Sequence, residues 1–197
     1  MTEMEGRAYP RTVQSPAGDF TLRPMTADDE AAVLAFAQSL PVHDLLFLPR
    51  DISQPRVLSA WTKEIERGTL TTLLAVRGFQ VLGCAALVQD PLSWSPHVGE
   101  IRVVVSRTVR KQGVGRALSQ EIFALALSKG LERLTAQMTV DQVGAIAIFE
   151  GLGFRAEALL RKHVRDRDGE LHDIVVLGHD VPQVHAAMEA YGFPEAV

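Results

Sequence analysis

The sequence predicts an α/β fold: a mixed, twisted sheet of about seven strands with helices on both faces. Short β-rich segments alternate with amphipathic helical segments along most of the chain. Two pairs of β-rich segments are joined by short connections that contain Arg77-Gly78 and Asp168-Gly169, which predicts antiparallel hairpins. Residues 98–140 and 131–164 each follow a strand–helix–strand pattern, which predicts crossovers between parallel strands. A sheet that holds both kinds of pairing is mixed.

Each element has its own signal in the sequence. Residues 1–18 are polar and aperiodic and predict a loose or peripherally docked N-terminal arm. Thr26 with Asp29 marks one helix start, and Ser53 with Pro55 marks a second. The expected strands are 20–22, 69–76, 80–88, 98–105, 131–140, 154–164 and 170–179. The expected helices are 27–39, 53–67, 113–129, 142–152 and 180–191. We therefore expect an arm at 1–18, one domain at 19–181, and a C-terminal helix and tail at 182–197.

Composition excludes several classes of protein. The 197 residues are 47% hydrophobic and 22% charged, which is ordinary for a globular domain. The single cysteine cannot form an internal disulfide, and without a cluster of ligating residues we expect no metal. A net charge of −4 argues against a nucleic-acid partner. Residues 1–20 lack the apolar core of a signal peptide, and no apolar run approaches the roughly 20 residues that span a bilayer. We expect a cytoplasmic protein that binds no membrane.

The most informative segment is Val103–Leu118, where a valine-rich strand leads through a basic loop into a helix. Glycines in such a loop allow backbone N–H groups to approach a ligand, and a helix start favours anions. Four cations and no acid lie here, which suits a pyrophosphate; they are Arg107, Arg110, Lys111 and Arg116. The spacing alone also fits tight strand–helix packing beside a solvated basic face. The third glycine of the dinucleotide fingerprint and the Gly-Lys-Ser/Thr of a P-loop are absent.

Two motifs resemble those of the GNAT N-acetyltransferase superfamily. Arg110, Gly113 and Gly115 match its R/Q-x-x-G-x-G acetyl-CoA motif. Downstream, the run A-I-A-I-F-E-G-L-G-F at 145–154 is similar to its A-I-x-L-Y-E-K-L-G-F. The order of the expected elements also fits, and the resemblance covers about residues 19–180.

The resemblance implies an acetyl-CoA-dependent N-acetyltransferase. The acetyl group would move to a primary amine of a small molecule or a protein, by direct attack in a ternary complex. The family binds the pantetheine arm between two splayed strands and the pyrophosphate on loop N–H groups. The implied cofactor-binding residues are Val103, Val104, Val105, Arg110, Lys111, Gln112, Gly113, Val114, Gly115, Arg116, Gln142 and Phe149. The partner would be an amine-bearing acceptor, and a homodimer is left open.

The sequence departs from the family pattern at two positions. Phe149 replaces a tyrosine that is thought to protonate the departing CoA thiolate. Gln137 lies where the family often places a glutamate, and an amide is not a base. These departures leave an alternative open, a catalytically degenerate acyl-CoA-binding or regulatory module. A third possibility is a scaffold that binds a protein partner and no CoA, although the intact basic loop argues against it.

Candidate catalytic and acceptor residues come from less specific signals. Glu100 lies inside an apolar strand and is a candidate general base, although a salt bridge to Arg102 is the alternative. His97 precedes that strand and is a second candidate base. Segment 43–51 takes the place of the acceptor-binding region of the family, so the expected substrate-binding residues are Asp44, Phe47 and Asp51. A loop held in place by its apolar residues is the alternative reading of that segment.

Overall fold

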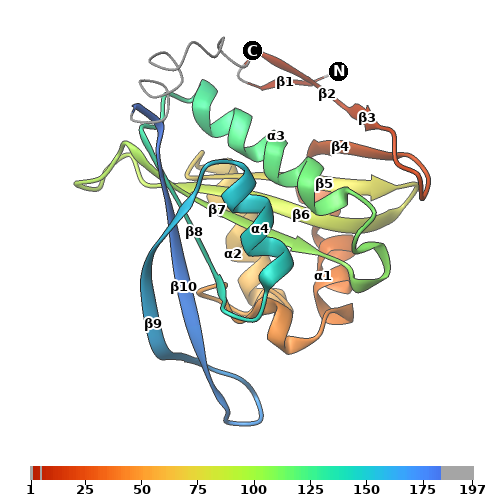
Figure 1. Ribbon diagram of the computed structural model, residues 1–197. Coiled ribbons are helices and arrows are strands. Elements are labelled where there is room, and N and C mark those ends of the chain that lie inside the picture. The colour runs from red at the N-terminus through yellow and green to blue at the C-terminus, as the bar shows by residue number, and fades with distance from the viewer. Residues whose placement is uncertain (1, 5, 183–197) are drawn as a thin grey trace.

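A computed structural model describes residues 2–4 and 6–182, and in it one eight-stranded mixed sheet dominates the fold (Figure 1). The strand order is β3-β4-β5-β6-β7-β8-β10-β9. Only β7 and β8 pair in parallel. The strands of this sheet are β3 (Arg11–Val13), β4 (Phe20–Pro24), β5 (Leu70–Arg77), β6 (Gln80–Gln89), β7 (Val98–Val105), β8 (Arg133–Thr139), β9 (Arg155–Arg165) and β10 (Leu171–Asp180). The predicted mixed α/β architecture is confirmed, with eight strands instead of about seven because β3 joins the edge.

Helices cover both faces of the sheet, as predicted (Figure 1). Helix α3 (Val114–Ser128) packs on β6 and β7, and α4 (Val143–Gly151) packs beside α3. The opposite face carries α1 (Glu30–Ser39) and α2 (Pro55–Glu66). Short 3₁₀ turns connect these elements, namely η1 (Ala27–Asp29), η2 (Val42–Leu45) and η3 (Arg107–Val109). None of the described helices combines the length and apolar composition needed to cross a bilayer.

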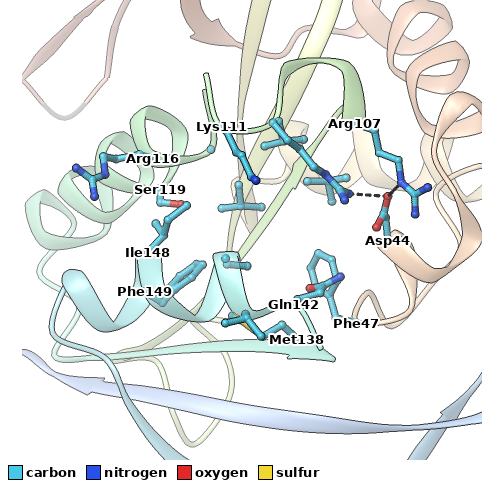
Figure 2. A pocket seen from close by; sticks show the side chains of 18 of the residues that line it. Asp44, Phe47, Arg107, Lys111, Arg116, Ser119, Met138, Gln142, Ile148 and Phe149 are labelled. Carbon is cyan, nitrogen blue, oxygen red and sulfur yellow. Dashed lines mark hydrogen bonds and ion pairs between the residues drawn. The ribbon is translucent and has the colours of Figure 1, made fainter. Parts of the chain in front are cut away.

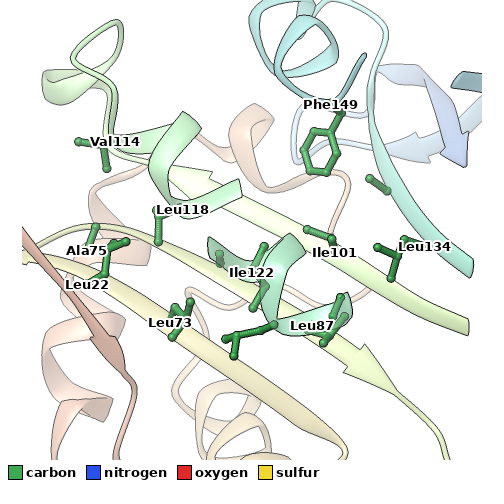
Figure 3. Close-up of a cluster of buried hydrophobic side chains, with 14 of the residues drawn as sticks. Leu22, Leu73, Ala75, Leu87, Ile101, Val114, Leu118, Ile122, Leu134 and Phe149 are labelled. Carbon is green, nitrogen blue, oxygen red and sulfur yellow. The ribbon is translucent and has the colours of Figure 1, made fainter. Parts of the chain in front are cut away.

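Each face of the sheet has its own hydrophobic core. Under α3 and α4, side chains of both helices pack against those of β4 to β8 and of β10 (Figure 3). The buried positions Val114, Leu118, Ile122 and Leu125 recur every three or four residues, so they form one stripe of α3 that faces the sheet. Strands β5 and β6 are buried along nearly their whole length, because helices cover them from both sides.

The parallel strands β7 and β8 separate at their carboxyl ends. Their register runs only from Val98↔Arg133 to Glu100↔Thr135, although β7 continues to Val105 and β8 to Thr139. Beyond that point, backbone groups on the facing edges of the two described strands have no cross-strand partner. This opening in the middle of the sheet positions the candidate site.

The N-terminal arm contains three short strands that the sequence pattern did not predict. Strands β1 (Thr2–Met4) and β2 (Arg7–Tyr9) form a hairpin, and β3 pairs with β4. Glu121 of α3 fixes this arm: Arg7 Nε donates to it at 2.7 Å, the buried Tyr9 hydroxyl at 2.8 Å, and Arg11 also pairs with it. Of the two arrangements expected for the arm, the described residues show the docked one, with α3 as the docking surface.

The C-terminal half holds one further difference from the sequence pattern. Residues 131–164 form the expected crossover, but β10 lies between β8 and β9. Strand β9 is consequently an edge strand, and its side chains are mostly exposed. The helix expected at 180–191 and the tail to 197 lie almost entirely outside the described residues.

Candidate active site

A cavity of about 760 Å³ occupies the opening between β7 and β8 (Figure 2). Its walls come from four parts of the chain: the ends of β7 and β8, the loop after β7 with the start of α3, helix α4, and η2. Most of the lining is apolar, and its apolar residues include Val103, Val104, Val105, Met138 and Ile148. An elongated ligand with one charged end would fit such a cavity.

The loop at 107–116, called the basic loop below, closes one end of the cavity. Gly113 is the N-cap of α3 at φ +85°, and Lys111 also has a positive φ of 62°. A β-carbon on Gly113 would meet nothing within 4 Å, so the space over the helix start is open. Because first-turn N–H groups lack intrahelical acceptors, this helix start suits an anion. The cations that line the cavity here are Arg107, Arg110, Lys111 and Arg116.

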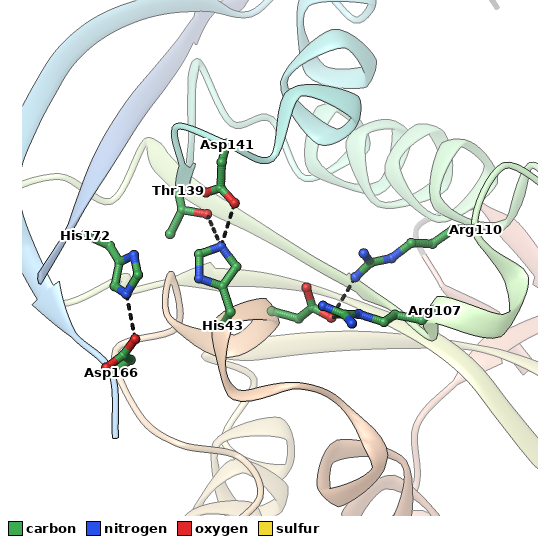
Figure 4. A network of polar contacts seen from close by, with 8 residues as sticks. His43, Arg107, Arg110, Thr139, Asp141, Asp166 and His172 are labelled. Carbon is green, nitrogen blue, oxygen red and sulfur yellow. Dashed lines mark hydrogen bonds and ion pairs between the residues drawn. The ribbon is translucent and has the colours of Figure 1, made fainter. Parts of the chain in front are cut away.

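A further wall of the cavity is formed by η2, which lies against the Arg107–Arg110 part of the basic loop and bridges the separated strand ends. Asp44 is buried, and its Oδ2 lies 2.7 Å from Arg110 Nη2 and 3.3 Å from Arg107 Nε. Its neighbour His43 reaches the other side, where its Nε2 lies 2.7 Å from Asp141 Oδ2 (Figure 4). Two adjacent residues thus connect η2 to the loop after β7 and to the loop after β8.

The structure brings most of the predicted cofactor residues to one cavity. Ten of the twelve line it: Val103, Val104, Val105, Arg110, Lys111, Gly113, Gly115, Arg116, Gln142 and Phe149. Gln112 lines a smaller adjacent hollow against the arm, while Val114 is fully buried in the core. The Phe149 ring packs at 90° to that of Phe154, with centroids 5.1 Å apart, which fixes its orientation in the wall.

The predicted catalytic residues lie outside this cavity lining. Glu100 forms two 2.8 Å hydrogen bonds with the Arg102 guanidinium, which is the salt bridge considered as its alternative role. His97 is exposed, and its carbonyl accepts from the N–H of Glu132 and of Arg133. Both assignments stay predictions from sequence.

The predicted acceptor-binding residues do not all lie at the same cavity. Asp44 and Phe47 line the cavity, but Asp51 does not. Asp51 accepts hydrogen bonds from Ser53 and from Arg167 at the tip of the β9–β10 hairpin. Burial opposes ionisation of this carboxyl, and the hydrogen bonds outweigh it, lowering the pKa of Asp51 to about 2. Asp51 therefore joins the loop before α2 to the hairpin.

Sequence reasoning did not single out His43 and Asp141, although both line the cavity. They lie 98 residues apart in the chain, and no local pattern links them. One signal in the sequence points to Asp141: it lies directly before the helix that carries the second family motif.

One cluster of side chains has the composition of a metal site. Asp166, Glu170 and His172 at the β9–β10 turn bring one ligand atom each within 4.8 Å of one another. Asp166 Oδ1 accepts the N–H groups of Asp168 and Glu170, and its Oδ2 lies 2.8 Å from His172 Nε2. The hydrogen bonds of the turn account for this convergence, so we assign no ion to it.

Comparison with solved structures identifies the same architecture in known acetyltransferases. A GNAT-family acetyltransferase from Streptococcus pneumoniae superposes with a TM-score of 0.71 at 20% identity, over 82% of this chain and 99% of that one. A ribosomal-protein-alanine N-acetyltransferase from Brucella melitensis gives 0.70 at 23%, over 81% and 98%. A protein from Salmonella typhimurium described as a putative acetyltransferase, solved with its cofactor acetyl-CoA, gives a TM-score of 0.69 at 18% identity, over 82% of this chain and 94% of that one. At these identities the likeness establishes the fold.

The family assignment rests on sequence. No curated protein matched the chain. The model of the acetyltransferase (GNAT) family matches residues 31–154, a span that holds both motifs and all of the predicted cofactor residues. The chain belongs to the acetyltransferase (GNAT) family.

Proposed function

We propose that this protein transfers the acetyl group of acetyl-CoA to a primary amine, by direct attack in a ternary complex. The observation that carries the proposal is the cavity between the separated ends of β7 and β8, which ends on the basic loop at the start of α3. Such a shape suits a long ligand with phosphates at one end and an acyl group at the other. The Salmonella typhimurium relative solved with acetyl-CoA supports the same cofactor here.

The basic loop would hold the phosphates. N–H groups at the start of α3 supply donors, and a helix N-terminus favours negative charge. Lys111 and Arg116 add positive charge to the same end of the cavity. A β-carbon on Gly115 would make ordinary van der Waals contact with Val105 at 3.5 Å, so the helix start packs closely on the strand end.

The strand opening would hold the extended arm of the cofactor. Backbone groups on the facing edges of β7 and β8 can pair with amides of a ligand, as an added strand would. This contact needs no particular side chain, which fits the three consecutive valines of β7. The acyl group would then lie near η2, where Phe47 and Gln142 line the cavity.

The chemistry asks for little beyond positioning and proton transfer. Acetyl-CoA supplies an activated thioester. The amine must be neutral to attack, and an alkylamine with a pKa near 10.4 is almost fully protonated at pH 7. Phe149 has no hydroxyl with which to protonate the thiolate, so we assign that proton to water or to the attacking nitrogen.

Binding and transfer can be measured separately. Calorimetry with acetyl-CoA, and with a short acetyl thioester that lacks phosphates, should show that the phosphates carry much of the affinity. Transfer to a panel of polyamines, amino acids, aminoglycosides and peptides is followed by release of the CoA thiol and by product mass. The single cysteine, Cys84, is buried and burial raises its pKa to about 12, so it will contribute little background to a thiol reagent. Absence of acetyl-CoA binding would refute the proposal.

A second candidate is an acyl-CoA-binding or regulatory module without transfer. Phe149 and Gln137 favour this candidate, because both line the cavity and neither side chain can act as a general acid or a general base. This module would bind acetyl-CoA and acetylate none of the amines. Recovery of transfer in Phe149→Tyr would then identify the lost hydroxyl as the cause.

A further inference from the structure

Two histidine–carboxylate pairs contact each other at the η2 end of the cavity (Figure 4). His43 Nε2 lies 2.7 Å from Asp141 Oδ2 and 3.4 Å from Thr139 Oγ1. His172 Nε2 lies 2.8 Å from Asp166 Oδ2. The two imidazole rings meet edge to face, with their centroids 5.0 Å apart. Three segments that are distant in sequence thus converge here: η2, the end of β8, and the β9–β10 hairpin.

Building on the proposed function, we propose that the His43–Asp141 pair accepts the proton of the acceptor ammonium. His43 is then the catalytic base, and Asp141 is the positioning residue that holds its ring. Both residues line the cavity, at the end where the acyl group would lie. The His43 side chain is 32% exposed, so the ring is accessible to a ligand and to solvent.

The proton transfers balance within this arrangement. The ammonium gives one proton to Nδ1 of the neutral imidazole, whose Nε2–H donates to Asp141, and the freed amine attacks the thioester carbonyl. A C–N bond forms, the C–S bond breaks, and the second nitrogen proton passes to the thiolate. The products are the amide, the CoA thiol and an imidazolium beside the Asp141 carboxylate. The imidazolium then gives its extra proton to water.

The surroundings favour this role for His43. A histidine side chain with a free ring nitrogen can accept a proton from a bound amine, and histidine is the side chain that most often acts as a general base. Burial opposes ionisation of Asp141, but hydrogen bonds with Thr139 and His43 outweigh it and hold the pKa of that carboxyl below its ordinary value. An ionised carboxylate stabilises the imidazolium that forms and orients the ring.

The other charged groups around His43 are already paired. Asp44, its neighbour on η2, is held by Arg107 and Arg110. On the hairpin side, His172 is held by Asp166. Among the carboxylates of the described residues, Asp141 is the one that lies within hydrogen-bond distance of the His43 ring.

The rival bases are placed less favourably. Among the described residues that line the cavity, His43 is the one histidine. Glu100 is engaged by Arg102, and neither Glu100 nor His97 lines the cavity.

The test compares His43→Gln and Asp141→Asn with wild type on one accepted amine, over a full pH–rate profile. The matched control is His163→Gln, which changes an exposed histidine of β9. We expect His43→Gln to lower kcat by 10²–10⁴-fold at pH 7 and to remove the acidic limb due to the histidine, leaving only the rise that follows the amine's own deprotonation. Activity should recover toward high pH, where the amine loses its own proton. Asp141→Asn should lower kcat less and move the limb to lower pH, whereas His163→Gln should match wild type. Acetyl-CoA binding, measured by calorimetry, should be unchanged in all three.

Each outcome separates this proposal from the proposed function. If wild type acetylates the amine and folded His43→Gln keeps both its kcat within threefold and the acidic limb, the base assignment is overturned and transfer stands. If wild type binds acetyl-CoA but acetylates nothing, both proposals are overturned. Rescue of His43→Ala by added imidazole, with no effect of imidazole on His163→Ala, would support the base assignment directly.

Discussion

Arg110 of the basic loop is ion-paired with Asp44 of η2, with Nη2 and Oδ2 2.7 Å apart. Arg107 shares the same oxygen at 3.3 Å. The pair joins the proposed phosphate-binding loop to the end of the cavity where an amine would enter. The Asp44 carboxylate is buried, whereas both guanidinium groups are about half exposed or more. The two arginines therefore neutralise the negative charge of Asp44.

This pairing predicts that Asp44→Asn affects stability more than amine binding. The amide keeps the shape of the side chain but loses the charge that two arginines share, which should cost about 1–3 kcal/mol. Urea unfolding measures this loss, with Asp28→Asn as the control because Asp28 is exposed. The KM for the amine should change by less than threefold. A tenfold rise in that KM at unchanged stability would instead support the acceptor role predicted from the sequence.

The open space over Gly113 predicts a specific effect of charge on cofactor affinity. Gly113→Asp should weaken acetyl-CoA binding at least tenfold, or about 1.4 kcal/mol, because a carboxylate would lie at the helix start where phosphates are proposed. Gly113→Ala controls for backbone strain, since φ is +85° at this position. Gly130→Asp controls for the charge, because Gly130 has φ +72° and open space at the other end of α3. Equal affinities of Gly113→Asp and Gly113→Ala, by calorimetry, would contradict the phosphate assignment.

The lowered pKa of Glu121 predicts that acid weakens the contact between the arm and α3. Burial opposes its ionisation, but hydrogen bonds from Arg7, Arg11 and Tyr9 outweigh it, so the pKa of Glu121 lies below its ordinary value of 4.5. A carboxyl with a lowered folded-state pKa adds stability that is fully present above about pH 4.5 and is lost as pH falls through the folded value. Glu121→Gln should therefore be less stable than wild type at pH 7, by about 1–3 kcal/mol.

The difference between the two proteins should shrink as the pH falls. Urea unfolding between pH 3 and pH 7 measures it, with the exposed Glu132→Gln as control. A gap between wild type and Glu121→Gln that stays constant down to pH 3 would show that ionisation of Glu121 does not stabilise the arm.

Local patterns in the sequence predicted the frame of the site, while long-range contacts decided its details. The apolar stripe of α3 and the valine run of β7 are local, so both elements were predicted from pattern, and the family resemblance supplied the predicted cofactor residues, ten of which line one cavity. Strands β1 to β3 span three residues each, too short for any period to show. The η2 contacts join residues 63 and 98 positions apart, and only the folded chain brings those charges together.

The Glu100–Arg102 pair predicts that Glu100 has a structural role. The two side chains lie on one face of β7, two residues apart, and their hydrogen bonds use both carboxylate oxygens and two guanidinium nitrogens. Both are mostly buried, so Glu100→Gln should leave Arg102 without a charged partner and cost about 1–3 kcal/mol. Transfer should keep its acidic pH limb, because the carboxylate is engaged and outside the cavity lining.

A double-mutant cycle measures this role. Arg102→Gln alone should destabilise the protein by a similar amount, and the double variant should cost less than the sum, because the two polar groups stabilise each other. If Glu100 is instead the general base predicted from the sequence, Glu100→Gln will lower kcat by 10²-fold or more and remove the acidic limb, while Arg102→Gln keeps that limb. The pH–rate profiles of Glu100→Gln and His43→Gln therefore decide which side chain accepts the proton, since only one of them should lose the limb.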